Sequence, residues 1–184
     1  MELSEALVGA AGHGDLESVV FFLDHGADPN GGDAEALCVA AQEGHLHVVR
    51  ELIARGADVH GRDDLPLRLA AFCGHLEVVR FLHERGANIP ADDNDAVGNA
   101  AEQGHLDVVR YLADHGADVT ARDHVLAIVV AKHGHLEVLR ELAARGLDLH
   151  AFEDQALDIA EQEGHDDIAA FLRKTWDGRM KDER

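Results

Sequence analysis

The sequence predicts an all-α array of six stacked helix-turn-helix units. Two observations support this prediction, a fixed period and an apolar pattern with helical spacing. A Gly-His pair followed by an apolar segment recurs every 30 residues, and its copies begin at Gly44, Gly74, Gly104 and Gly134, with weaker ones at Gly14 and Gly164. A period of this length indicates stacked supersecondary units rather than one closed globule.

The first helix of each unit is illustrated by the repeat from Asp63 to Asp92. We expect this helix to run from about Leu65 to Cys73, with Asp64 as its cap and a proline in the first turn, where a missing N–H costs nothing. Gly74 then ends the helix. We expect short loops between repeats and little or no strand.

The second helix of the same unit begins after the Gly-His turn. It is apolar on most sides, and its polar residues Glu77, Arg80 and Glu84 are spaced i, i+3 and i+7, which predicts one exposed stripe. Such a helix needs neighbours on most sides, which stacking supplies. Gly86 ends it, and the other units place a glycine at the same point: Gly26, Gly56, Gly116 and Gly146.

The composition narrows the classes of partner. The chain has 184 residues, 46% of them hydrophobic, and 36 Asp and Glu stand against 16 Lys and Arg, a formal charge of −20. This balance disfavours nucleic acids and anionic membranes, because phosphate binding depends on Lys and Arg. The acidity either confers solubility or attracts a basic partner.

The chain carries no sign of export or of membrane insertion. Residues 1–5 lack the basic and apolar regions of a signal peptide, and no apolar run approaches the ~20 residues of a membrane span. Cys38 and Cys73 are the only cysteines, which is no disulfide framework. We therefore expect an intracellular, cytoplasmic protein.

The unit closely resembles the ankyrin repeat, in its helix, Gly-His turn, second helix and Gly-Ala-Asp-Val ending, from about Ser4 to Lys174. The usual ankyrin unit has 33 residues and opens with Thr-Pro-Leu-His; here Leu65-Pro66-Leu67-Arg68 comes nearest. Three residues are missing where ankyrin proteins normally project a β-hairpin. The shortened form is similar to arrays of giant DNA viruses, which would place the protein in the host cytoplasm.

The resemblance implies a single domain over residues 1–184. We expect an N-terminal capping repeat at about 4–33, internal repeats at about 34–153, and a C-terminal capping repeat with a tail at about 154–184. The end units are more polar than the others, as at Asp15 and Asp166, and end units of a solenoid need a polar outer face.

Neither a metal site nor a catalytic site is expected. Five histidines recur at one position: His45, His75, His105, His135 and His165. Helices in adjacent repeats lie ~8–10 Å apart, too far for neighbouring histidines to share a zinc ion with bonds near ~2 Å, so we expect a structural role. No nucleophile signature surrounds the cysteines, and we expect no cofactor and no enzymatic activity.

The resemblance implies that a partner is bound on the concave side, by first-helix surfaces and inter-repeat loops. The residues before each Gly-His turn and in the loops vary, while the framework is constant. The candidate partner-binding residues are Gln42, Glu43, Arg62, Asp64, Leu65, Phe72, Cys73, Asp92, Asn94, Glu102, Gln103, Arg122, His124, Lys132 and His133. Only the third unit places an aromatic ring beside a thiol, at Phe72 and Cys73; either this pair is the binding centre or Phe72 packs into the core.

These observations predict a monomeric, non-enzymatic module that binds a partner protein, possibly one with a basic surface. Two alternatives remain. One is a structural protein that self-associates through the array, and the other is a metal- or redox-responsive module that uses the histidines or Cys73.

Overall fold

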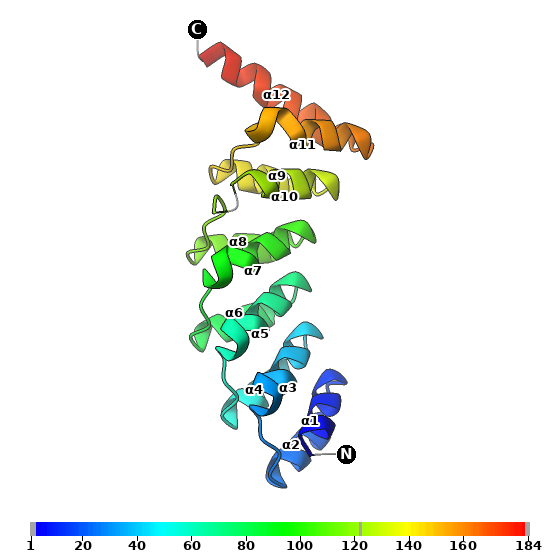
Figure 1. The fold of residues 1–184 in the computed structure, drawn as a ribbon, viewed down its shortest axis with the longest axis vertical. Coiled ribbons are helices and arrows are strands. Elements are labelled where there is room, and N and C mark those ends of the chain that lie inside the picture. Colours follow the sequence, from blue (N-terminus) through cyan, green and yellow to red (C-terminus); the bar gives the residue numbers. More distant parts are fainter. Residues whose placement is uncertain (1–2, 122, 183–184) are drawn as a thin grey trace. The chain divides into compact units, whose positions relative to one another are not determined.

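The computed structural model describes residues 3–121 and 123–182; the side chains at 93, 123, 124, 151–153 and 176–182 are outside that description. Within these ranges the chain forms helices and turns with no strand, and Figure 1 shows the helices following one another in pairs. The helices are α1 (Leu3–Gly12), α2 (Leu16–Asp24), α3 (Gly31–Gln42), α4 (Leu46–Ala54), α5 (Gly61–Phe72), α6 (Leu76–Glu84), α7 (Ala91–Glu102), α8 (Leu106–Asp114), α9 (Asp123–Lys132), α10 (Leu136–Ala144), α11 (Ala151–Gln162) and α12 (Asp166–Asp182).

The chain divides into two compact units, Met1–Ala96 and Val97–Arg184. In the first unit, the first helices α1, α3 and α5 pack in sequence, and the second helices α2, α4 and α6 follow the same order beside them. In the second unit α9 packs on α11, and α8 on α10. The predicted helix-turn-helix architecture is confirmed. The prediction of one domain over the whole chain stays a prediction.

The core repeats with the sequence. The alanine pairs Ala40-Ala41, Ala70-Ala71 and Ala100-Ala101 of the first helices are fully buried and let neighbouring helices approach closely. One leucine of each second helix after the first is fully buried as well: Leu52, Leu82, Leu112, Leu142 and Leu172. The stripe of Glu77, Arg80 and Glu84 on α6 is exposed, as predicted.

The structure explains the recurring histidines. The Nε2 of His75 donates a hydrogen bond to the carbonyl oxygen of Gln42, at 2.8 Å, and His45 and His165 make the same contact with Gly12 and Lys132, at 3.1 and 2.9 Å. Each contact joins the Gly-His turn of one repeat to the end of the first helix in the preceding repeat. The predicted structural role of these histidines is therefore confirmed.

The inter-repeat loops hold a conformation that the sequence analysis did not predict. At the start of α5, Arg62, Asp63 and Asp64 have φ between 52° and 57°, a left-handed turn that precedes the regular helix. Gly32, Asp33 and Ala34 repeat this turn in α3. The regular helix begins at Leu65, as expected, but Asp64 does not cap it. Its Oδ1 instead accepts the backbone N–H of Asn88 in the next loop, at 2.9 Å, and lies 2.9 Å from His60 Nδ1.

Candidate binding surface

The surface with most exposed candidate residues lies at the ends of the first helices, before each Gly-His turn. In the first compact unit, Gln42 and Glu43 are exposed at the end of α3. Phe72 is 42% exposed at the end of α5, and Cys73 beside it is half-buried. These four residues form what we call the turn-side surface. Phe72 therefore does not pack into the core, which was the second reading of the sequence.

The carboxylate of Glu43 at the end of α3 acts electrostatically on the thiol of Cys73 at the end of α5. Burial raises the pKa of the Cys73 thiol, and the nearby carboxylate of Glu43 raises it further. Burial also raises the pKa of Cys38, which lies in the core of α3. Both shifts favour the protonated thiol, which is the unreactive form. Cys73 thus adds apolar surface next to Phe72 rather than a nucleophile.

Leu65 and Phe72 lie two turns apart on α5 and share a helix face. Between them Arg68, which the sequence analysis passed over as a binding candidate, forms ion pairs with Asp92 at 2.6 Å and Asp95 at 2.7 Å. The guanidinium is largely shielded by these two carboxylates. The ion pairs of Arg68 therefore separate Leu65 from Phe72 on this face. Asp92, one of the predicted contact residues, is already paired with Arg68.

Two of the predicted contact residues are buried and are left out of the surface. Asp64 is 5% exposed and Asn94 is 9% exposed. Their left-handed backbone turns the side chains inward, and for Asp64 the hydrogen bonds to the adjacent loop account for the burial. Arg62 is exposed and donates to the carbonyl oxygen of Gly32, at 2.5 Å. Arg122 and the side chain of His124 lie outside the described residues.

The second compact unit carries the remaining candidates. Gln103, Lys132 and His133 are exposed, and Glu102 is half-buried. His133 Nδ1, just past the end of α9, contacts the carbonyl oxygen of Val129 in that helix, at 3.0 Å. These four residues lie at the C-terminal ends of α7 and α9, as the turn-side surface lies at the C-terminal ends of α3 and α5.

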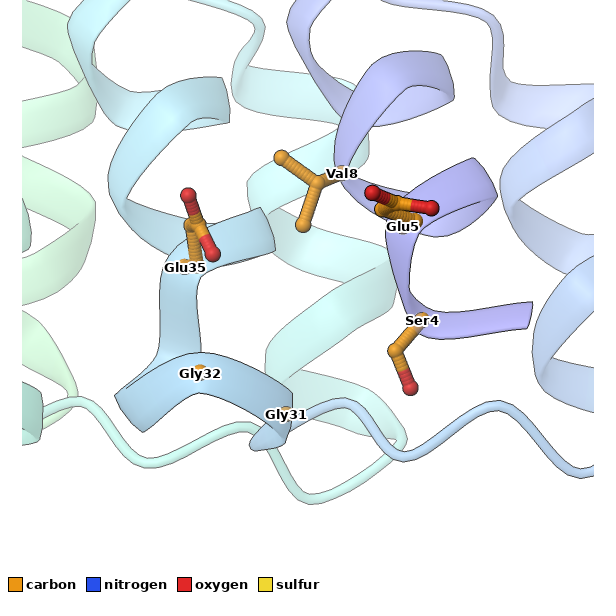
Figure 2. Close-up of a pocket in the computed structure, with 6 residues that line it drawn as sticks. All are labelled: Ser4, Glu5, Val8, Gly31, Gly32 and Glu35. Atoms are coloured by element: carbon orange, nitrogen blue, oxygen red, sulfur yellow. The ribbon is translucent and has the colours of Figure 1, made fainter. Parts of the chain in front are cut away.

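The structure adds an acidic opening between α1 and α3. Figure 2 shows its lining, in which Val8 lies between the carboxylates of Glu5 and Glu35, with Gly31 and Gly32 on one side. Its volume is about 320 Å³, and Ser4 completes the lining. This opening was not predicted from the sequence; the absence of side chains at the glycine pair was the available signal. Because both glutamates are exposed, the opening suits a cationic side chain.

Comparison with known families decides the classification. The model described as "Ankyrin repeats (3 copies)" matches residues 7–93 and 64–123, more than half of the chain. The chain belongs to the ankyrin repeat family. A comparison with curated proteins found no match. The ankyrin assignment agrees with the paired helices and with the contacts of the Gly-His turns, and proteins of this family typically bind other proteins.

Two further findings concern other functions. Among the described residues of this ankyrin array, no three His, Cys, Asp or Glu side chains are grouped so that they could hold a metal ion. Within the same residues, no helix is both long enough and apolar enough to cross a membrane.

Proposed function

We propose that this ankyrin array is a non-enzymatic module that binds a partner protein through its first-helix side, which the family resemblance identifies as the concave side. The observation that carries the proposal is the exposure of Phe72 at the turn-side surface. An aromatic ring that is 42% exposed, beside a half-buried thiol, interrupts a row of polar residues at that position. Binding hot spots are enriched in aromatic residues surrounded by polar groups.

The proposed partner carries a basic surface. The turn-side surface includes Glu43, and the opening at α1 and α3 presents Glu5 and Glu35. No Lys or Arg precedes Arg50 in the sequence, so the first repeat and most of the second are acidic. Carboxylates arranged around apolar groups fit a partner that offers Lys or Arg next to an apolar side chain.

The test begins with the isolation of proteins that bind the purified chain from the source cell. The affinity of each purified candidate is then measured for the parent chain, for Phe72→Ala and for Val125→Ala. Val125 is 59% exposed and lies near the start of α9, away from the turn-side surface, so it controls for the loss of an exposed apolar group outside that surface.

We expect Phe72→Ala to weaken binding by about 2 kcal/mol or more, the scale of a hot spot, while its circular dichroism and free energy of unfolding stay close to those of the parent. Val125→Ala should bind nearly as tightly as the parent. Equal affinities for all three chains would place the binding site elsewhere.

A further inference from the structure

Phe21 on α2 occupies a position that is buried in the third repeat and half-buried in the other later repeats. Its equivalents 60 and 150 residues later are Phe81 and Phe171, and each lies under an arginine of the preceding repeat. The guanidinium carbon of Arg50 lies 4.6 Å from the ring centroid of Phe81, and that of Arg140 lies 5.5 Å from the ring centroid of Phe171. Phe81 is only 3% exposed. The position is therefore part of the contact between consecutive repeats.

In the first repeat the same position is open. Phe21 is 53% exposed, and its stacking partner is His25 of the same repeat, with ring centroids 4.1 Å apart. Gly9 on α1 is open as well, since a Cβ atom placed there would meet nothing within 4 Å. Its equivalent Val39 packs against Gly12 of the preceding repeat. The first repeat thus presents to solvent a surface of the kind that later repeats cover wholly or in part.

Negative charge surrounds this surface. Glu17 lies one turn before Phe21 on α2 and Asp24 one turn after it, and both are exposed. The carboxylate of Asp24 forms an ion pair with the guanidinium of Arg55, at 2.7 Å, whereas α2 has no Lys or Arg that could pair with Glu17. An aromatic ring between carboxylates fits a partner surface that combines an apolar hollow with positive charge.

The described part of the second compact unit holds such a hollow. A cavity of about 580 Å³ between α10 and α12 is lined by Arg140, Asp167, Ala170, Phe171, Lys174 and Thr175. Ala170 is exposed and stands where the four preceding repeats have an arginine, so the hollow has a small side chain at this point of its lining. Two cations, the carboxylate of Asp167 and an aromatic ring thus border an open space.

We propose that Phe21 of one copy of the chain docks into the hollow between α10 and α12 of a second copy. Glu17 and Asp24 of the first copy then face Lys174 and Arg140 of the second. The Phe21 ring meets Phe171 and a cation, and its equivalents Phe81 and Phe171 meet a cation inside the array. The contact joins two different patches, so it can link successive copies unless a ring closes. It departs from the monomer expected from the sequence, and it does not involve the turn-side surface.

The test is sedimentation of the full purified chain over about two decades of micromolar concentration, at low and at high salt. We expect the average mass to rise above the monomer mass of 19.9 kDa with concentration, and to rise less in high salt. Phe21→Ser and Lys174→Glu should each weaken the association at least about tenfold, because each removes one half of the contact. Circular dichroism of both variants checks that they remain folded.

A mixture of the two variants distinguishes this contact from a symmetric one. Phe21→Ser keeps an intact hollow and Lys174→Glu keeps an intact Phe21, so the mixture should form a 1:1 dimer that cannot grow. Phe72→Ser and Val125→Ser, which change exposed apolar residues elsewhere, should associate like the parent. A parent chain that stays monomeric, a mixture that forms no dimer, or equal losses in the two controls would overturn the proposal. If Phe72→Ala did not weaken partner binding, the proposed function would be contradicted, but the proposed self-association would still stand.

Discussion

Gly44 shows how a single residue sets the distance between repeats. Its φ of +75° lies in the left-handed region, and the His75 ring of the next repeat lies over it. A Cβ atom at this position would be 2.6 Å from His75 Nδ1, which is closer than van der Waals contact allows. The glycine therefore serves the backbone conformation and the contact between repeats at the same time.

The first prediction separates these two roles of the glycine. Gly44→Ala should destabilise the chain by more than Gly26→Ala, because Gly26 has a φ of +92° but a Cβ atom there would meet nothing within 4 Å. We expect Gly26→Ala to cost roughly 1–2 kcal/mol for the left-handed conformation, and Gly44→Ala to cost about 1–3 kcal/mol more because the His75 ring must move. Urea unfolding measures the free energy of unfolding of both variants. Equal losses of this free energy would mean that the His75 ring moves aside at no energetic cost.

The second prediction concerns pH. Burial lowers the pKa of His135 below its usual range. The hydrogen bond with the backbone of Glu102 opposes this shift, and the electrostatic effect of His133, His105 and His165 adds to it. The unfolded chain keeps a histidine pKa near ~6.5. As the pH falls below that value, the unfolded state takes up a proton that the folded state does not. The stability from neutral His135 is thus fully present above about pH 6.5 and declines as the pH falls toward the lowered pKa.

Urea unfolding of the parent and of His135→Gln at several pH values between about 7.5 and 5.5 measures this effect. The parent should lose more free energy of unfolding over this range than the variant, even though the variant starts less stable. The comparison is needed because other groups in this acidic chain titrate as well. Parallel curves for the two chains would contradict the assignment to His135.

At the scale of one element, the left-handed turn of α5 replaces the β-hairpin that longer ankyrin units project. Left-handed residues other than glycine cost roughly 1–2 kcal/mol each, and Asp and Asn tolerate this conformation better than most. Six of the eight such residues in the described chain are Asp or Asn: Asp33, Asp63, Asp64, Asp92, Asn94 and Asp154. The recurring acidic residues before the first helix are therefore turn residues.

The third prediction tests that assignment. Asp63 is exposed and has a φ of 56°, so Asp63→Gly should leave the free energy of unfolding unchanged or raise it by up to about 1 kcal/mol. The same substitution at Glu77, an exposed residue in the regular helix α6, should lower it by about 1 kcal/mol. Thermal or urea unfolding gives the sign, and a loss at Asp63 as large as that at Glu77 would exclude the left-handed turn.

The sequence predicted the helices well because their signals are local. Gly74 and Gly86 mark helix ends, and the Ala70-Ala71 pair marks a close helix contact. It did not predict where Asp64 points, because that depends on the N–H of Asn88 in the next repeat. For the same reason the sequence could not separate the buried Asn94 from the exposed Asp92, nor show that Phe21 is left uncovered.

At the scale of the whole molecule, the charge of −20 is the property that a partner meets first. The fourth prediction is that the association rate with a basic partner falls as added salt reduces the Debye length below ~8 Å. A Glu5→Gln, Glu35→Gln double variant should lower the rate at low salt and flatten the dependence. Stopped-flow or surface-binding kinetics measure both, and rates that do not change with salt would limit the role of the acidity to solubility.

The contact between His75 and Gly44 has a consequence for how such a gene can change in length. The two residues are 31 positions apart, and the same contact recurs one period away. Deletion of residues 44–73 would join Glu43 to Gly74 and bring the ring of His75 onto Gly14, the partner that His45 has now. Whole periods can therefore be lost or duplicated without leaving a ring and a glycine unmatched, whereas an insertion of one or two residues between Gly44 and His75 would change the spacing on which their contact depends.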